Sequence, residues 1–585
     1  MEEGKPNPSP DGTPEAADAH EGRTKEPKHI GTKEVVVSPS IADPDNKAAA
    51  ISIDTDDHGY LTGIKRTGEL TGIKLTVIIA ALSVTSFLLL LDMSIVSTAV
   101  PRITSDFHSL TDIGWYGSAY LLSRIQHCYD LFQKEANNLE SSCALQPMTG
   151  KIFSQFDSKL GSLLSAVATS SNIFIVGRAV AGMGASGLSN GGLTIIALSI
   201  PLQKRAVYMG ILMGISQLGV LFGPLLGGAL TEHASWRWCF YINLPAGALA
   251  AIFLFFIRIP SHHTKRTDKP SFRSILKSLD LVGFILFAPA AIMFLLALQW
   301  GGNTYKWDSA TIIGLFCGSA ATVVVFIGWE YTRGDSAMIP LSMVKKRPIA
   351  SSCMVQLFQF GSMLSTSYYL AIYFQAVRGF APTLSGVYML PSILSQLMLG
   401  IVSGILVGRL GYYLPFIIFG TGLTSIGSGL MSTLTPTSAT GAWIGYQIIS
   451  GAGRGGGLQM PILAIQSNLK PQEIPVGMGL GIFCQSIGGA LFLSFAQTIF
   501  STSLVDALPD FAPEVDAQAV INAGAAGARD IVSKALLPGV LLAYNQAVSH
   551  VFYLAAGASA VAFVFSWGMG WKSVKKAKVV TPAAE

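Results

Sequence analysis

Charged residues are scarce in this sequence. Asp, Glu, Lys and Arg make up 12% of its 585 residues, where an ordinary soluble domain has roughly 25%. Half of the residues are hydrophobic, and the mean hydropathy is +0.49. The net charge of +5 is small and falls largely in loops, so it does not indicate a nucleic-acid-binding surface. Most of the chain is therefore predicted to lie in a membrane.

Motifs for metal, disulfide and catalytic chemistry are lacking too. The six cysteines form no CxxC pair and no regular framework, so neither a zinc site nor a disulfide scaffold is expected. Walker A and HExxH motifs are absent, and Gly451, Gly453 and Gly456 spell GxGxxG without a preceding strand. These observations argue against an ATP-driven pump, a zinc-dependent hydrolase and a dinucleotide site. We expect no enzymatic activity and no cofactor.

Apolar runs of about 20 residues are what the sequence has in abundance, and this length crosses about 30 Å of hydrocarbon. Two damaged runs lie between the first clear run and the second, which gives an intended total of fourteen spans. The twelve clear runs are 75–99, 171–199, 206–230, 238–258, 279–299, 309–329, 350–375, 384–407, 413–433, 441–465, 476–499 and 549–571.

Lys and Arg concentrate in alternate connections, such as 258–277 and 333–347. By the positive-inside rule, these connections and both chain ends are cytoplasmic. Residues 1–73 are predicted to be a disordered tail without a cleavable signal peptide, and residues 572–585 form a second cytoplasmic tail. The connection 500–548 is then external, with a short helix at the surface.

The two halves of the chain echo each other. Glycines of GRAVAGMGASG, which starts at Gly177, recur at a constant offset in YQIISGAGRGG, which starts at Tyr446. Gly182 thus corresponds to Gly451. Related halves of this kind are typical of transporters.

Four stretches resemble the major facilitator superfamily, specifically its fungal-type fourteen-span drug:proton antiporters. They are LDMSIVSTAVPRIT from Leu91, GRAVAGMGASG from Gly177, GVLFGPLLGG from Gly219 and WRWCFYINLPAG from Trp236. The resemblance implies an all-α polytopic membrane protein with two six-helix bundles, 74–258 and 349–571, and two extra spans in a linker, 259–348. It implies export of drugs, toxins or secondary metabolites in exchange for protons.

The GVLFGPLLGG stretch matches the antiporter motif of this family, which is thought to shape the interface with the opposite half. Glycines also allow close helix packing in lipid, so a general packing face is the alternative. The motif residues are Gly219, Gly223, Pro224, Gly227 and Gly228.

Two charges within apolar runs are the candidates for proton coupling. Asp92 follows FLLLL in the first run, and an intramembrane carboxylate is functional by default. The alternative is that the first span ends near Leu91 and Asp92 faces the external headgroups. Arg178 matches the arginine of the family's fourth-span motif and would favour the ionised form of a nearby acid; the alternative is an arginine that snorkels to the leaflet edge. Arg454 has no clear role.

The cavity that binds substrate is predicted from polar and aromatic residues at related places in the two halves. Gln217 and Gln485 could hydrogen-bond a polar group of a drug, and aromatic rings suit broad apolar ligands. The candidates are Gln217, Gln485, Tyr120, Tyr369 and Tyr373.

Two faults interrupt the pattern. Residues 124–142, RIQHCYDLFQKEANNLESS, place five charged residues in the second span, and the third span, near 160–170, has about 10 residues where roughly 20 are needed. Our hypothesis is that an intron of nineteen codons is read as protein and that coding sequence is lost near Leu160. The loop motif GKIFSQFDSK, Gly150 to Lys159, lacks the family's acid and arginine, so salt-bridge gating is not expected there.

The sequence thus predicts a monomeric, proton-coupled exporter of hydrophobic small molecules, in the plasma membrane or the vacuolar membrane. Its partners are the substrate, protons and the lipid bilayer, with no nucleic acid and no metal. Proton-coupled uptake of a siderophore or an amino acid is one alternative. A non-transporting product of a faulty gene model is the other.

Overall fold

The computed structural model describes residues 51–55, 61–66, 73–124, 157–199, 202–256, 281–302, 305–334, 337, 339–470 and 473–573. The chain divides into two units, Met1–Glu69 and Leu70–Glu585. The predicted insert lies outside the described residues except for Arg124, and so does the cytoplasmic tail beyond residue 573.

The first unit contains a two-stranded antiparallel hairpin where the sequence predicts disorder. Strand β1 (Ile51–Thr55) pairs with β2 (Leu61–Arg66), and Ile53 lies opposite Ile64. Isoleucine alternates with polar residues in β1, and β-branched side chains favour strands.

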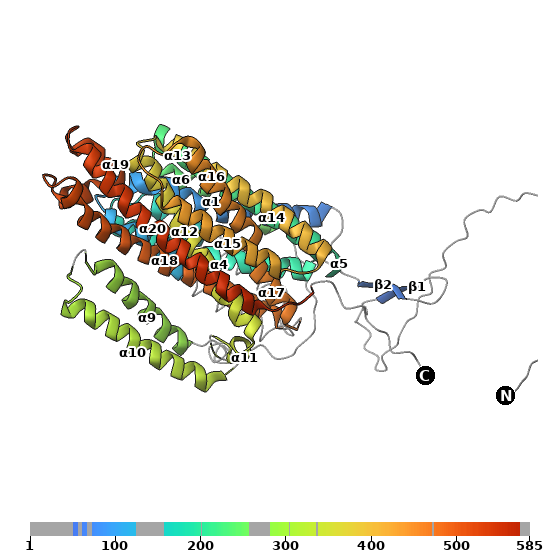
Figure 1. The fold of residues 1–585 in the computed structure, drawn as a ribbon. Helices are drawn as coiled ribbons and strands as arrows, with labels where there is room; N and C mark the ends of the chain where they lie inside the picture. Colours follow the sequence, from blue (N-terminus) through green and yellow to red (C-terminus); the bar gives the residue numbers. More distant parts are fainter. Residues whose placement is uncertain are drawn as a thin grey trace, which may run out of the picture. The chain divides into compact units, whose positions relative to one another are not determined.

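The second unit opens with a helical half. It consists of α1 (Ile73–Asp106), helical residues 113–124 and 157–166, α4 (Ser171–Ser199), α5 (Leu202–His233), the short α6 (Trp238–Tyr241) and α7 (Asn243–Phe256). The 3₁₀ turn η1 (Leu110–Asp112) follows α1. These elements contain the six spans expected for the N-terminal half (Figure 1), and of the second and third spans the structure describes helical residues 113–124 and 157–166.

Two linker helices follow, α9 (Leu281–Trp300) and α10 (Ala310–Arg333), as the sequence predicts. The Ser309 hydroxyl accepts the Ile312 N–H and caps α10. Helix α9 packs on α18 of the second half, where Phe294 meets Phe495 with 6.1 Å between ring centroids and the Thr498 hydroxyl donates to the Leu298 carbonyl. Helix α10 packs on α9.

The C-terminal half has six further spans. The first is α12 (Arg347–Ile372), which continues as a π-helical turn, η3 (Tyr373–Val377). The others, with their short partners, are α11 (Leu341–Val344), α13 (Pro382–Tyr388), α14 (Leu390–Leu410), α15 (Leu414–Met431), α16 (Thr440–Gly457), α17 (Met460–Asn468), α18 (Ile474–Phe511), α19 (Ala517–Ile531), α20 (Leu537–Ser566) and the 3₁₀ turn η4 (Trp567–Met569).

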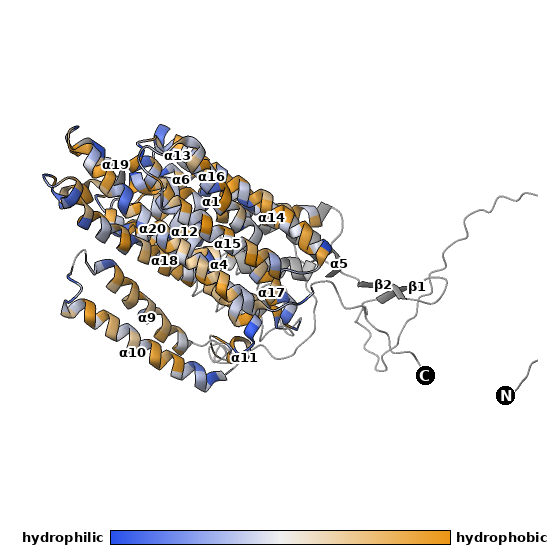
Figure 2. Ribbon diagram, viewed as in Figure 1, coloured by the Kyte–Doolittle hydropathy of each residue, from blue (hydrophilic) through white to orange (hydrophobic). Residues whose placement is uncertain are grey.

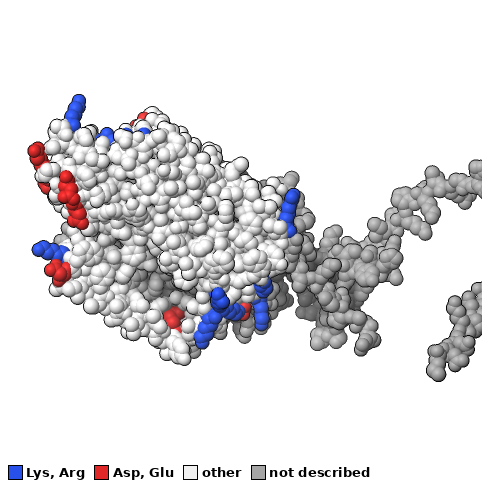
Figure 3. Space-filling model, in the orientation of Figure 1, with Lys and Arg blue, Asp and Glu red and all other residues white. Residues whose placement is uncertain are grey.

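All twelve predicted apolar runs contain helix, which confirms the all-α fold apart from the hairpin. Among the described residues, eight helices are long and apolar enough to cross a membrane. Hydrophobic residues predominate along the helices in Figure 2, and the charged side chains in Figure 3 lie mostly toward the two ends of the helices. This distribution fits a protein whose middle is surrounded by lipid.

Equivalent glycines bring equivalent helices together in the two halves. A Cβ atom at Gly182 of α4 would strike the carbonyl of Tyr120 in helical residues 113–124. A Cβ atom at Gly451 of α16 would strike the carbonyl of Ser392 in α14. In each half the fourth span therefore packs closely on the second, so the corresponding glycines make corresponding contacts.

Several hydrogen bonds between the two halves lie toward the ends of the helices that the topology places outside, and a further one runs from the buried Ser118 hydroxyl to the Ala490 carbonyl at 3.0 Å. The predicted external helix is α19, but α18 and α20 extend into the same connection and α19 buries Val520 and Ala528. The bonds run from Gln375 to the Thr98 carbonyl at 3.0 Å, from Gln497 to the Leu110 carbonyl at 3.0 Å, from the Thr383 N–H to Glu232 at 3.1 Å and from the Gly527 N–H to Ser105 at 3.1 Å.

Candidate functional site

The two charges that the sequence singles out lie together inside the N-terminal half. An Arg178 terminal nitrogen is 2.9 Å from Asp92 Oδ2, and the two residues are 2% and 7% exposed. Helix α1 continues past Asp92 to Asp106, so Asp92 is within the helix and not at its end. The pair joins α1 to α4. Its role in proton coupling remains a prediction.

Backbone and ring contacts hold the Arg178 guanidinium in place. Its Nε donates to the Tyr116 carbonyl at 3.3 Å, and its central carbon lies 4.4 Å from the ring centroid of Tyr120 and 5.8 Å from that of Phe240. Cation–π contacts of this kind stabilise a desolvated guanidinium. Tyr120, expected in the substrate cavity, thus lies against Arg178.

Asn243 is a member of this site that sequence reasoning did not single out. Its side-chain N–H donates to Asp92 Oδ1 at 2.9 Å, and its own oxygen has no hydrogen-bond partner among the described residues. Asn243 is the first residue of α7 and lies within WRWCFYINLPAG. A buried amide just after the Trp-rich stretch was the available signal.

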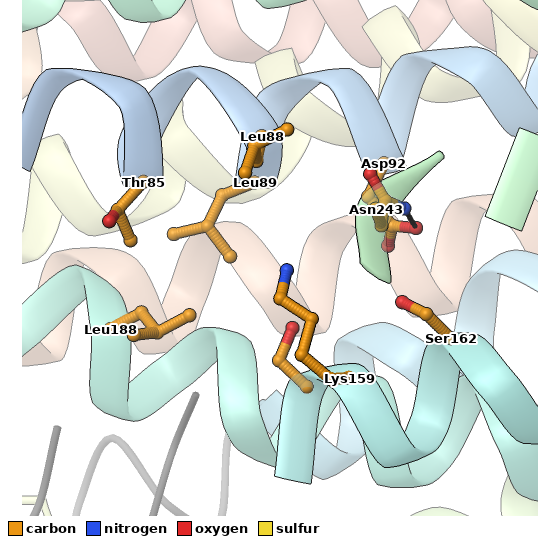
Figure 4. A pocket seen from close by; sticks show the side chains of 9 residues that line it. Thr85, Leu88, Leu89, Asp92, Lys159, Ser162, Leu188 and Asn243 are labelled. Atoms are coloured by element: carbon orange, nitrogen blue, oxygen red, sulfur yellow. Dashed lines mark hydrogen bonds between the residues drawn. The ribbon is translucent and has the colours of Figure 1, made fainter. Parts of the chain in front are cut away.

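Lys159 also borders the pocket beside Asp92, which corrects its expected place in a cytoplasmic loop. Figure 4 shows its ammonium group pointing into the space below Leu89, on the same side of α1 as Asp92 and Asn243. Lys159 belongs to helical residues 157–166, which end just before α4 begins on the outer side. The part of the chain that precedes residue 157 lies outside the described residues.

The antiporter-motif residues of α5 divide between two neighbours. Cβ atoms at Gly219, Gly223 and Gly227 would strike the α1 backbone or the side chains of Ser94 and Thr98. These glycines thus serve packing within the N-terminal half, and the Ser94 hydroxyl donates to the Gly219 carbonyl at 3.0 Å.

Pro224 and Gly228 face the other half instead. A Cβ atom at Gly228 would strike the Pro382 carbonyl, and one at Gly386 of α13 would strike the Pro224 carbonyl. This contact agrees with the interface role that the family resemblance implies for the motif.

Two other residues that are predicted to line the cavity form hydrogen bonds within the C-terminal half. Tyr369 and Tyr373 are fully buried; their hydroxyls donate to Gln497 at 3.0 Å and to the Thr435 carbonyl at 2.8 Å. Gln485 borders a separate pocket between α12, α16, α17 and α18, and Gln217 does not border that pocket. The structure therefore does not bring the two glutamines together there.

Arg454 is the second buried guanidinium. It is 3% exposed, its Nε donates to the Ser450 carbonyl at 3.4 Å, and no acidic residue among those described forms an ion pair with it. It therefore differs from Arg178, whose charge is balanced by Asp92.

Two helical halves closed at one end, with an ion pair buried in one of them, define a membrane carrier of the two-bundle type. The chain belongs to the Major Facilitator Superfamily, whose family model matches residues 159–493. It is 53% identical over 542 residues to the MFS-type transporter pigP of Monascus ruber, covering 91% of this chain and 90% of that protein. It is 51% identical to the efflux pump mlcE of Penicillium citrinum, covering 85% and 90%.

Solved structures agree on the fold. A bacterial homologue of the human lysosomal transporter Spinster, in an inward-facing and occupied conformation, superposes with a TM-score of 0.59 at 15% identity and covers 85% of this chain and 98% of that one. A D-xylose–proton symporter superposes with a TM-score of 0.53 at 12% identity, covering 84% and 97%. The protein is thus a multi-pass membrane protein of a family that carries small molecules.

Proposed function

We propose that the protein exports hydrophobic small molecules in exchange for protons. The observation that carries this proposal is the buried ion pair of Asp92 and Arg178, because it provides an acid inside the bundle that can lose and regain a proton. Export as the direction is supported by relatives named efflux pumps, such as mlcE.

The pair couples proton binding to helix packing. Ionised Asp92 uses both oxygens, one toward Arg178 and one toward Asn243. A proton on Asp92 removes the negative charge, whereas Arg178 keeps its positive charge at any working pH. Removing one partner of a buried pair costs about 3–5 kcal/mol, so protonation favours an arrangement in which α1 and α4 move apart or Arg178 meets water.

The hydrogen bonds between the halves would break and re-form in each cycle. Four of them join α1, η1 and α5 to η3, α13, α18 and α19, which closes the outer side. Alternating access requires these bonds to open while the inner side closes. The proposed location is the plasma membrane, with the vacuolar membrane as the alternative, and one chain supplies both halves without a second copy.

Proton coupling is tested with Asp92→Asn in reconstituted vesicles. An imposed pH gradient should drive uptake of a fluorescent hydrophobic drug by the unaltered chain. In Asp92→Asn the rate should no longer depend on the gradient, because an amide does not titrate. The measurement is initial rate against the imposed pH difference.

Asp106→Asn is the matched control, because it makes the same change on the same helix at an outer residue that accepts the Trp236 N–H at 2.7 Å. An asparagine oxygen can still accept that bond, so gradient dependence should persist. If Asp92→Asn transports with unchanged coupling, Asp92 is not the coupling residue. If the imposed pH gradient drives no drug movement in the direction of export, the exporter assignment is wrong.

A further inference from the structure

A second pocket lies within the C-terminal half, and glutamine dominates its polar wall. Its cavity volume is about 40 Å³. Gln356 and Gln359 are one turn apart on α12, Gln485 is on α18, and Gln459 lies between α16 and α17. The remaining lining residues are Phe360, Leu458, Pro461 and Ile462. None of the lining residues is charged.

Gln356 has unused hydrogen-bonding groups in this pocket. It is 5% exposed, and neither its amide nitrogen nor its amide oxygen has a partner among the described residues. Gln359 donates to the Thr424 hydroxyl at 3.1 Å, and its oxygen is likewise without a partner. A buried polar group without a partner is destabilising, so a ligand that satisfies these groups gains binding free energy.

We propose that this pocket binds the polar end of the substrate, and that this end is a neutral group with a hydrogen-bond donor and an acceptor side by side. A lactam, an imide and a primary amide have this pattern. It complements the Gln356 amide whichever way that amide is turned, because its donor and acceptor are also adjacent. A charged end is disfavoured, since no lining residue carries a balancing charge.

The small volume of the pocket accommodates one polar group and not a whole drug. Phe360 and Ile462 continue the wall with apolar surface, against which the start of an apolar tail can pack. This inference rests on the proposed function, which supplies a hydrophobic substrate. The inference specifies in addition where the polar end of the substrate binds and which functional groups that end carries.

The test measures equilibrium binding to the full chain in lipid nanodiscs, with no pH gradient. Three probes share one apolar tail and end in a secondary lactam, its N-methyl derivative or the corresponding cycloalkane. The lactam should bind about tenfold more tightly than the cycloalkane, in line with one to two neutral hydrogen bonds. The N-methyl lactam, which has lost its donor, should fall between them.

Gln356→Met keeps the length of the side chain but removes the amide, and it should bring the lactam-to-cycloalkane ratio close to one. Gln447→Met is the matched control: Gln447 is a buried glutamine of α16 that donates to the Tyr388 carbonyl at 2.9 Å and does not border the pocket. It should preserve the ratio. The comparison of the three probes on the unaltered chain decides the matter even if Gln356→Met does not fold.

The outcomes separate this inference from the proposed function. Equal binding of the three probes, or an unchanged ratio in Gln356→Met, overturns the assignment of the pocket, whatever the proton coupling. A preserved preference for the lactam together with transport that ignores the pH gradient overturns the proton-coupled function but supports the pocket.

Discussion

Asp92 receives its two partners from helices that are far apart in the sequence, α4 and α7. The sequence predicts that Asp92 and Arg178 are both special, because a charge in an apolar run is costly. It does not predict Asn243, because an amide near the end of an apolar run is inexpensive and common. Nor does it place Tyr120 beneath Arg178, since ring orientation depends on how three helices pack.

Lys159 gives a prediction at the same scale. In Lys159→Met the pocket beside Asp92 loses the cation that lines it. Because this changes the charge balance around the buried ion pair, the pH profile of efflux should differ from that of the unaltered chain. The measurement is initial efflux rate against pH at a fixed pH difference, with Lys534→Met, in the external connection between α19 and α20, as the control. A profile identical to that of the unaltered chain would show that Lys159 does not influence Asp92.

At the scale of elements, the sequence reveals the glycine pattern of α5 but not which neighbouring helices the motif residues face. Glycines four residues apart predict a close contact, which the structure shows between α5 and α1. The sequence cannot tell that Pro224 and Gly228 face α13, because α13 is about 150 residues away and its short run of residues gives no periodic signal. The external helix was predicted, yet its burial between two halves depends on contacts with Ser105 and with η3.

Helix α19 is expected to hold the outer side closed. Arg529 donates to the carbonyls of Ala376 and Val377, at 2.8 and 2.6 Å, while the Gly527 N–H reaches Ser105 of the other half. A Cβ atom at Gly527 would be 3.9 Å from the Ser105 Cβ atom, and about 3.8 Å is the usual separation in a disulfide.

The double variant Ser105→Cys, Gly527→Cys should therefore form a disulfide and stop transport under oxidising conditions. Transport should return when a reductant is added, because the link joins halves that must separate on the outer side. The measurement is efflux rate with and without reductant, and each single variant is a control. Full transport by the oxidised, cross-linked chain would contradict the role of α19.

At the scale of the whole molecule, the scarcity of charged residues and the spacing of the apolar runs are sufficient to predict twelve helices and two related halves. The same reasoning did not place Lys159, which the structure brings to the pocket that Asp92 also lines. The hypothesis that coding sequence is lost near Leu160 stays a prediction.

The linker helix α10 gives a prediction about insertion. Val324 lies near its middle and is 69% exposed on the bundle, so it should face lipid. A lysine at the centre of a spanning helix costs roughly 3 kcal/mol, and Val324→Lys should strongly reduce the fraction of chains in which α10 crosses the membrane. The measurement uses a glycosylation-site reporter placed after α10, which is glycosylated only in chains in which α10 fails to cross the membrane.

Tyr331→Lys is the control, because Tyr331 is 75% exposed but lies in the last turn of α10, where a lysine can extend to the membrane surface. It should leave insertion nearly unchanged. Normal insertion of Val324→Lys would show that this face of α10 is covered by protein or water.

Arg454 gives the C-terminal half a positive charge that no described acidic residue balances. A membrane voltage acts on such a charge with about 2.3 kcal/mol per 100 mV over the full thickness of the membrane. Any rocking that carries Arg454 through part of this thickness makes the cycle electrically sensitive. Cells that hyperpolarise their membrane would thereby alter how fast the carrier turns over, even at constant pH on both sides.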